Sequence, residues 1–362
     1  MLQEKFWQGK RVLITGHTGF KGSWLCIWLH SLGASVTGYA LPPPSQPSLF
    51  ESCGIHRLVE SITADVRDLR RLSDVVAKAK PEIIIHMAAQ ALVRASYAAP
   101  VETYDTNVMG TVNLLEAVRK NPGVKAVINV TSDKCYENLE TLEGYHEENA
   151  LGGHDPYASS KACSELVTRA FHASFFHPDR YDTHSVALAT ARAGNVIGGG
   201  DWATDRLIPD CIRALAKKET LLLRFPQAIR PWQHVLEPLR GYLMLAEKLY
   251  MAGPEFSGAW NFGPAEEDTR TVLSVVKKLC EAWEAPQGYA LMDGDQPHEA
   301  GLLKLNCAKA RKRLGFRPQW DVDIALEKVV AWAKAYERGE DMLAFSQKQI
   351  AEYQEKRASY HE

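Results

Sequence analysis

The chain has 362 residues and a formal net charge of −2 at pH 7, with 46% hydrophobic and 24% charged residues. This balance is typical of a globular protein, and the small net charge gives no general attraction to nucleic acid or to an anionic membrane surface. The length predicts about two domains, or one large domain with a substrate-binding extension.

The seven cysteines are dispersed, with no Cys-x-x-Cys pair and no histidine at metal-ligand spacing. We therefore predict neither a metal site nor a disulfide framework, and reduced thiols fit a cytoplasmic protein. The first ten residues contain no long apolar stretch and no small-residue cleavage site, so we expect no signal peptide. No segment approaches the roughly 20 apolar residues that span a bilayer.

Short β-rich runs alternate with helical patterns through the first two-thirds of the chain. The expected strands are residues 11–15, 34–39, 61–64, 83–87, 126–131 and 183–191. Several of them are continuously apolar, as in strands that are covered on both faces. The expected helices between them are residues 22–32, 69–79, 107–119 and 157–175. This alternation predicts an α/β fold with a doubly wound parallel sheet of the Rossmann type.

The pattern changes near Gly198, where loops rich in glycine, proline and tryptophan begin. Helical periodicity returns in residues 239–251, 271–282 and 322–337, and the charged tail from Asp341 is typical of a terminal helix. We therefore divide the chain into a sheet domain, residues 1–197, and a mainly ligand-binding lobe, residues 198–362. The lobe is expected over the carboxyl edge of the sheet, with crossings of the chain between the two parts.

A glycine-rich turn follows the first strand directly and opens the next helix. Glycines there permit a tight turn, close approach of the backbone to a pyrophosphate, and packing of the helix on the strand. The helix N-terminus supplies N–H donors and the positive end of a dipole. A turn without a ligand is the alternative. The predicted dinucleotide-binding residues of this turn are Gly16, His17, Thr18, Gly19, Phe20 and Gly22.

This predicted site departs from the usual pattern after the second strand. The acidic residue that commonly binds the adenosine ribose is missing, because Tyr39 and Ala40 lead directly into prolines. No arginine stands there for a 2′-phosphate, so NAD is favoured over NADP, with modest affinity. His17 stands where a small residue is more usual and is expected to stack on or crowd the adenosine. Asp65 and Val66 are predicted adenine contacts, unless Asp65 only caps the next helix.

Tyr157 and Lys161 lie four residues apart, and residues at this spacing share one face of a helix. The Lys161 ammonium would favour the phenolate, so a phenol with an ordinary pKa of about 10 could act as a base near neutral pH. Two solvated helix residues are the alternative. Here the pair follows the glycine turn and the segment Ser132-Asp133-Lys134, and these three pieces together indicate hydride and proton transfer.

These motifs resemble the extended short-chain dehydrogenase/reductase family, and within it the nucleotide-sugar 4,6-dehydratases. The resemblance covers nearly the whole chain and includes segments 86–90, 104–111 and 192–195. Segments 16–22, 131–138, 198–202 and 229–235 are most similar to the branch that acts on CDP-glucose, so a CDP-sugar substrate is implied by resemblance alone. NAD is the implied cofactor, and its further implied contacts are Ala88, Ala89, Gln90, Asn107, Tyr157 and Lys161.

The residues after Ser132 favour a dehydratase over an epimerase of the same family. An epimerase needs only oxidation and a return hydride, whereas a dehydratase must also remove the C5 proton and protonate the departing C6 hydroxyl. We predict that Tyr157, with Ser132, takes the 4-hydroxyl proton. Lys134 is the predicted C5 base and a protonated Asp133 the predicted acid.

Lys134 stands where many relatives carry glutamate. A neutral lysine requires a depressed pKa, and a protonated Asp133 requires a raised one. The alternative is that Asp133 and Lys134 form an ordinary ion pair at the end of a strand.

A nucleotide sugar carries a pyrophosphate, so the second lobe should supply cations and amides. Arginine suits this task through its planar set of donors. By resemblance, Arg230 binds the diphosphate with help from Arg206. The alternative for Arg230, Arg206, Asn195 and His298 is that each is an exposed surface residue. The predicted substrate-binding residues are Asn195, Arg206, Arg230, His234 and His298.

The resemblance also implies an assembly and a pathway. In this family the helices that follow Asn107 and begin at Tyr157 commonly pair between subunits, so a homodimer is expected and a tetramer is conceivable. The pathway implied is that of deoxy sugars of bacterial surface polysaccharides. The competing interpretations are a nucleotide-sugar 4-epimerase, a dehydrogenase that releases NADH, and a non-catalytic dinucleotide-binding regulator.

Overall fold

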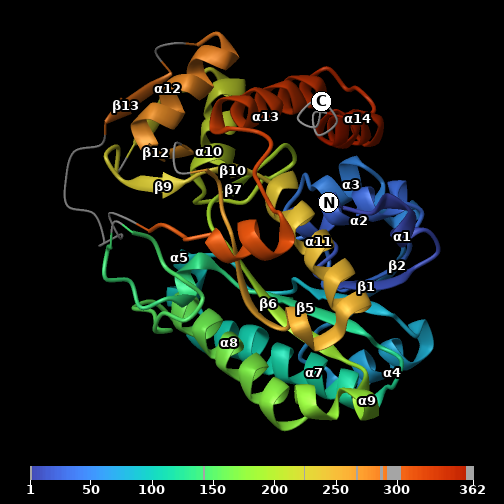
Figure 1. Ribbon diagram of the computed structural model, residues 1–362. Helices are drawn as coiled ribbons and strands as arrows, with labels where there is room; N and C mark the ends of the chain where they lie inside the picture. Colours follow the sequence, from blue (N-terminus) through green and yellow to red (C-terminus); the bar gives the residue numbers. More distant parts are fainter. Residues whose placement is uncertain are drawn as a thin grey trace.

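A seven-stranded sheet lies at the centre of the molecule (Figure 1). The computed structural model describes residues 2–141, 143–223, 225–265, 268–285, 288–291 and 303–355. All neighbouring strands of the sheet run parallel, in the order β11-β6-β5-β4-β1-β2-β3. The strands are β1 (Arg11–Thr15), β2 (Ser35–Ala40), β3 (Glu60–Thr63), β4 (Ile83–His86), β5 (Ala126–Val130), β6 (Ala187–Ala193) and β11 (Gly258–Phe262).

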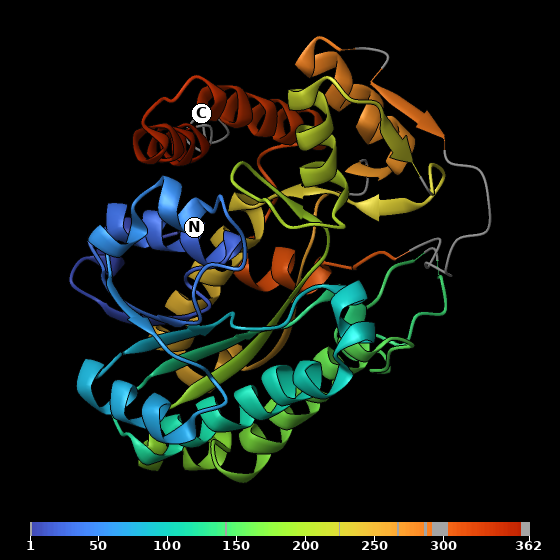
Figure 2. The ribbon, with the colours of Figure 1, turned by 180° about the vertical axis from the view of Figure 1, so that it is seen from behind.

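Helices cover both faces of this sheet. On one face lie α2 (Phe20–Ser31) and α11 (Leu236–Ala252), and on the other lie α4 (Leu69–Ala79), α7 (Gly110–Lys120) and α8 (Pro156–Ser174), as Figures 1 and 2 show. Alternate residues of β1 point to opposite faces, so Val12 and Ile14 join the core under α2 and α11, while Leu13 joins the core under α4 and α7. Both faces are buried, which explains the continuously apolar strands. The predicted α/β doubly wound sheet is confirmed.

The second lobe is built from helices and two-stranded pairs around its own apolar core. Ile208, Val276 and Leu326 belong to that core, each from a different helix. Its helices are α10 (Leu207–Lys217), α12 (Val272–Trp283) and α13 (Val322–Glu337), and its strands are β7 (Val196–Ile197), β8 (Leu221–Leu223), β9 (Ile229–Pro231), β10 (Gln233–His234), β12 (Thr269–Thr271) and β13 (Tyr289–Leu291).

The chain returns to the sheet after the point where we divided it. Helix α11 packs on β5 and β6, and β11 pairs with β6 at the edge of the sheet. The last helix, α14 (Met342–Glu355), packs on both α2 and α13 (Figure 2). The segment 198–362 therefore contributes to both parts, and the division at residue 197 stays a prediction.

Two predicted boundaries differ from the structure by four residues or more. Strand β6 begins at Ala187, because residues 181–184 form the short helix α9 (Tyr181–His184). The helix expected from Asn107 is a continuous run of α6 (Pro100–Tyr104), the π-helical turn Asp105–Met109 and α7. The other short helices are α1 (Glu4–Trp7), α3 (Leu49–Ser52) and α5 (Val93–Ala98). Within the described ranges, no helix has the length and apolar character needed to cross a bilayer.

Candidate active site

The predicted site residues come from the carboxyl ends of neighbouring strands. The strand order reverses between β1 and β4, and ligands of open parallel sheets bind beyond the carboxyl ends of the strands at such a point. Gly16 follows β1, Ala88 follows β4, and Ser132 follows β5. The parallel arrangement therefore brings the three segments to one edge of the sheet.

The glycine turn is packed too closely for side chains at two positions. Gly16 has a φ of 78°, and a Cβ atom there would lie 2.7 Å from the backbone nitrogen of Ala88. A Cβ atom on Gly22 would lie 2.1 Å from the carbonyl oxygen of Gly16. The Thr18 hydroxyl donates to the carbonyl of Leu41 at 2.9 Å. These contacts hold the turn against the segments after β4 and β2, and they explain why glycine is needed at positions 16 and 22.

His17 lies inside the protein, next to the second strand. Its Nε2 is 2.7 Å from the Ser61 hydroxyl, and its ring meets Phe50 edge to face. A Cβ atom on Gly38 would lie 2.3 Å from the ring. Burial lowers the pKa of His17 to about 4, so the ring is neutral at pH 7. The imidazole therefore fills the space over Gly38, and it is enclosed by protein where we had expected it to face the adenosine.

Asp65 does not cap the next helix. Its carboxylate accepts from the backbone nitrogen of Arg67 at 2.9 Å and forms an ion pair with that guanidinium at 2.6 Å. The N-cap of α4 is Asp68, whose carboxylate accepts from Arg71 at 2.9 Å. The neighbouring Val66 is buried, and its side chain lies against Gly110. The adenine contact of Asp65 and Val66 stays a prediction.

Asn107 links the segment after β4 to α8. Its Oδ1 accepts from the backbone nitrogen of Gln90 at 2.9 Å, and its Nδ2 donates to the Gln90 carbonyl at 3.0 Å. The same Nδ2 donates to the Ser160 hydroxyl at 2.8 Å. The hydroxyl of Ser96 accepts from the backbone nitrogen of Tyr157 at 3.1 Å, at the start of α8. The segment 88–90 and the helix that carries Tyr157 are therefore fixed relative to each other.

Tyr157 and Lys161 are both buried on α8, in the order predicted. The Lys161 ammonium donates to the carbonyl of Val130 at 3.2 Å, and burial lowers its pKa to about 8. Burial raises the pKa of Tyr157 to about 12, while Ser132 and Arg206 act against the rise. We had expected the charge of Lys161 to lower the pKa of this phenol, whereas removal of the hydroxyl from water is the largest influence and raises that pKa.

Asp133 lies in a short 3₁₀ turn, residues Asp133–Cys135, directly after Ser132, and is 4% exposed. The Ser132 hydroxyl donates to Oδ1 at 3.0 Å, whereas Oδ2 is buried and has no hydrogen-bond partner among the described residues. A Cβ atom on Gly194 would lie 2.7 Å from Oδ2, so a glycine leaves room beside that oxygen. Burial raises the pKa of Asp133 against the opposing charges of Lys134 and Arg230. The direction is the one that a general acid requires.

Lys134 is half-buried and follows Asp133 in the same turn. Its backbone nitrogen donates to the Ser132 hydroxyl at 3.2 Å. No ion pair joins Asp133 and Lys134 where the chain is described, so the simple ion-pair alternative is not what the structure contains.

The predicted substrate-binding residues occupy different environments. Arg230 on β9 is buried and close enough to Asp133 to affect its pKa, and one of its donors reaches the carbonyl of Ile229 at 2.9 Å. Arg206 precedes α10 and pairs with Asp201 at 3.1 Å. Asn195 is half-buried after β6, and its carbonyl accepts from the backbone nitrogen of Gln233 at 3.1 Å.

His234 is a core residue in this structure. It is fully buried, and its ring meets Trp24 and Trp320 edge to face. Its Nδ1 accepts from the backbone nitrogen of Leu236 at 3.3 Å, and burial lowers its pKa to about 3. The ring therefore packs in the core and has no exposed surface that a sugar nucleotide could contact. His298, the remaining predicted residue, lies outside the described residues.

Lys21 belongs to the same polar cluster, although we did not predict it. Its ammonium donates to the Tyr242 hydroxyl at 2.8 Å and lies 4.9 Å from the centre of that ring. Burial lowers its pKa to about 7, and the charges of Lys161 and Arg206 contribute in the same direction. A lysine in the first turn of a helix opposes the helix dipole, and that unfavourable placement is the sequence signal that could have identified Lys21.

In the described chain, no three His, Cys, Asp or Glu side chains are arranged to hold a metal ion.

The sequence profile of the GDP-mannose 4,6 dehydratase family matches residues 13–329. Over 353 residues the chain is 54% identical to the CDP-glucose 4,6-dehydratase of Salmonella typhimurium, and the alignment covers 98% of each protein.

Two solved structures show the same fold. The dTDP-glucose 4,6-dehydratase DesIV of Streptomyces venezuelae, with NAD and TYD bound, has a TM-score of 0.77 at 24% identity and covers 92% of this chain and 99% of its own. The UDP-glucose 4-epimerase of Thermotoga maritima, with UDP-glucose, has the same TM-score at 21% identity and covers 90% and 99%. Because both activities share the fold, these two likenesses do not distinguish between them.

Proposed function

The chain belongs to the GDP-mannose 4,6 dehydratase family of extended short-chain dehydrogenases/reductases, and we propose that it is a CDP-glucose 4,6-dehydratase. In this hydro-lyase reaction CDP-glucose becomes CDP-4-keto-6-deoxyglucose and water. The observation that carries the proposal is Asp133, a buried carboxyl group with a raised pKa and one unpartnered oxygen, three residues after the end of β5. An epimerase has no step that needs such an acid, whereas loss of the C6 hydroxyl does.

NAD fits the cradle formed by the glycine turn. Gly16, Gly19 and Gly22 carry no side chains, so a pyrophosphate could approach the backbone at the start of α2. Ala88, Ala89 and Gln90 lie on the opposite side of the turn, and Tyr157 and Lys161 would face the nicotinamide ribose. When bound, NAD accepts the hydride from C4 and later returns it to C6, so the net reaction is loss of water.

The first chemical task belongs to α8. Tyr157 takes the proton of the 4-hydroxyl group, and Ser132 shares the hydrogen bond to that oxygen. Because burial raises the pKa of the phenol to about 12, the phenolate needs positive charge close to it. Lys161, one helical turn away, and the Arg206 guanidinium are the cations that the chain supplies.

The second task belongs to the turn after β5. Oxidation at C4 makes the C5 proton acidic, and we assign its removal to Lys134. Asp133, whose pKa is raised by burial, donates a proton to the departing C6 hydroxyl. Water leaves and the bound sugar becomes a 4-keto-5,6-ene, which is reduced at C6 and reprotonated at C5.

Arg230 is the best-placed candidate for the diphosphate of the substrate. It lies near enough to Asp133 for the two charges to interact, so a sugar between them would span from the diphosphate to the acid. Arg206 would contribute a second cation and Asn195 a hydrogen bond. We do not assign His234 to the substrate, because its ring is enclosed by tryptophans.

We further propose a homodimer in the cytoplasm that serves deoxy-sugar formation for surface polysaccharides. Exposed apolar side chains gather on consecutive helices of one region: Tyr97 on α5, Val101 on α6, Met109 in the π-helical turn and Leu166 on α8. All seven cysteines are free, which suits a reducing compartment. Light scattering of the purified protein would distinguish monomer, dimer and tetramer.

The decisive test is incubation with CDP-glucose and catalytic NAD in deuterated water, followed by NMR of the sugar. We expect a 4-keto group, a new C6 methyl group and deuterium at C5. An unlabelled hexose inverted at C4 would instead establish the epimerase, and stoichiometric NADH with a released ketone would establish a simple dehydrogenase. Unchanged substrate would contradict the assignment of CDP-glucose.

A further inference from the structure

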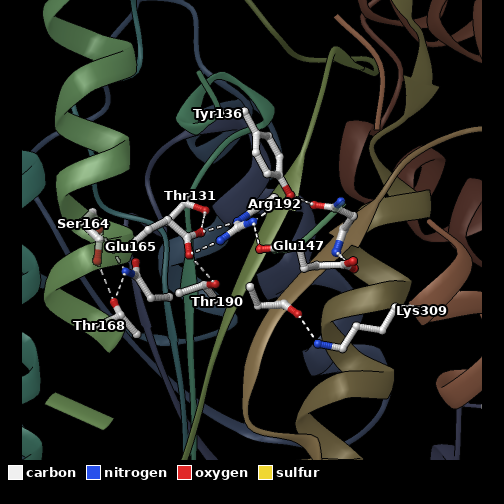
Figure 3. A network of polar contacts seen from close by, with 12 residues as sticks. Thr131, Tyr136, Glu147, Ser164, Glu165, Thr168, Thr190, Arg192 and Lys309 are labelled. Atoms are coloured by element: carbon white, nitrogen blue, oxygen red, sulfur yellow. Dashed lines mark hydrogen bonds and ion pairs between the residues drawn. The ribbon is translucent and has the colours of Figure 1, made fainter. Parts of the chain in front are cut away.

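A buried ion pair joins Glu165 and Arg192, and Figure 3 shows it with its polar contacts. Glu165 is one helical turn after Lys161 on α8, and its side chain is 4% exposed. Its two oxygens accept from both Nε and Nη2 of Arg192 on β6, at 2.9 and 2.8 Å. The same carboxylate accepts from the Thr131 hydroxyl at 2.5 Å and from the Thr190 hydroxyl at 2.8 Å. One carboxylate thus joins α8 to the ends of two neighbouring strands.

The guanidinium of Arg192 also reaches the segment after the acid–base turn. Its Nη1 donates to the hydroxyl of Tyr136 at 2.6 Å and to the carbonyl of Glu147 at 3.0 Å, and the guanidinium lies 4.8 Å from the centre of the Tyr136 ring. The Tyr136 hydroxyl in turn donates to Asn261 on β11 at 2.8 Å. The guanidinium of Arg192 is therefore held by the Glu165 carboxylate, the Tyr136 hydroxyl and the Glu147 carbonyl.

These contacts fix the turn Ser132–Asp133–Lys134 at both ends. Thr131, immediately before it, is bonded to Glu165, and Tyr136, two residues after Lys134, is bonded to Arg192. The turn itself is a single 3₁₀ turn that has little rigidity of its own. We propose that Glu165 and Arg192 are positioning residues that hold Asp133 and Lys134 in place for elimination, acting through Thr131 and Tyr136. This inference rests on the proposed function.

The oxidation residues on α8 have contacts of their own in addition to this network. Ser96 accepts from the backbone nitrogen of Tyr157, and Lys161 donates to the carbonyl of Val130. Weakening the contacts of Thr131 or Tyr136 should therefore displace the acid–base turn while Tyr157 and Lys161 keep their positions. Elimination should therefore slow far more than oxidation at C4, which depends on the turn only through Ser132.

The test avoids the two charged residues, because removing one partner of a buried ion pair leaves an uncompensated charge and threatens folding. Thr131→Val and Thr190→Val are matched, since each removes one hydroxyl that bonds the same carboxylate. Only Thr131 adjoins the acid–base turn. We expect Thr131→Val to lower kcat by about 10- to 100-fold with little change in KM, as misplacement of catalytic groups does. Thr190→Val should retain nearly normal kcat, with a similar loss in Tm.

A second pair of variants tests which step is affected. Tyr136→Phe removes the hydroxyl that bonds Arg192, whereas Tyr145→Phe removes the hydroxyl of the ring stacked on Tyr136, which bonds Asn138 instead. In single turnovers with CDP-glucose, Tyr136→Phe should accumulate NADH and lose C5 deuterium exchange, whereas Tyr145→Phe should behave as wild type. The melting temperature of each variant without cofactor reports on folding.

Three outcomes would overturn the inference. Equal losses of kcat in Thr131→Val and Thr190→Val would show that the network acts only on stability. Loss of NADH formation in Tyr136→Phe would place the defect at oxidation. Normal elimination in both Thr131→Val and Tyr136→Phe would show that the turn needs no such support. An active wild type with any of these results leaves the proposed function intact, whereas an inactive wild type would overturn both.

Discussion

The two halves of the catalytic machinery are built on very different supports. Tyr157 and Lys161 share α8, a helix of 19 residues that packs on the sheet, whereas Asp133 and Lys134 share a turn of three residues. A long helix fixes the relative position of residues one turn apart by its own hydrogen bonds. A single turn cannot, so its position depends on contacts from distant parts of the chain. The oxidation pair is thus defined locally and the elimination pair by tertiary structure.

The largest expected effect comes from the oxidation pair. Tyr157→Phe should lower kcat by about 10²–10⁴-fold, the usual contribution of general acid–base catalysis, because the variant lacks the phenol hydroxyl that takes the 4-hydroxyl proton. CDP-glucose binding, measured by calorimetry, should change little. No NADH should form in single turnovers. A normal rate in this variant would remove Tyr157 from the mechanism.

Lys134→Ala should separate the two halves. We expect oxidation at C4 to continue and elimination to fall by a comparable factor, about 10²–10⁴-fold, because the C5 base is lost. Rapid mixing followed by absorbance should reveal bound NADH, and NMR should show no deuterium at C5. If C5 exchange proceeds at the normal rate, another residue is the base.

Asp133→Asn should abolish elimination and at the same time raise the melting temperature. Burial raises the pKa of this carboxyl, so the folded state binds its proton more tightly than the unfolded state does. The stabilising protonation is fully present below the unfolded pKa, and stability falls as pH rises from there through the folded pKa. An amide carries no such charge, so the variant should be more stable than wild type at pH 7. A lower melting temperature would show that burial of the Asp133 carboxyl does not destabilise the wild-type protein at pH 7.

The pH dependence should expose the oxidation pair. Because the pKa of Lys161 is lowered to about 8, its charge is lost as pH rises through that value, and kcat should decline. Between about 8 and the unfolded value of 10.5 the unfolded state binds this proton and the folded state does not, so the contribution of Lys161 to stability increases. Glu165, Cys135, Lys21 and His86 are the titratable groups near it. Activity that stays constant to pH 10 would show that this charge is not required.

The smallest expected effect concerns the cofactor. The chain has no acidic residue after β2 for the adenosine ribose, and His17 fills the space beside Gly38. We expect purified protein to gain activity several-fold on addition of NAD and to lose it on dialysis. Full activity after exhaustive removal of NAD would indicate tight binding through other contacts.

The sequence predicted the sheet well and the environments of single residues poorly. Residues 83–85 of β4 are continuously apolar, and that pattern is local. Strand β11 was missed because its five residues follow α11, beyond the region where strands and helices alternate. The enclosure of His234 depends on Trp24 and Trp320, which are distant in the chain. The raised pKa of Tyr157 likewise depends on burial by several segments, which spacing cannot reveal.

The return of the chain to the sheet has a consequence for engineering. Helix α11 and strand β11 lie between segments of the second lobe, and α14 ends against α2. The lobe that we expect to select the nucleotide is thus discontinuous in the gene. Recombination at a single crossover between relatives would separate α11 or β11 from the sheet residues they contact. Transfer of nucleotide preference by chimeras will therefore require several coordinated grafts, and point substitution in the lobe is the more practical route.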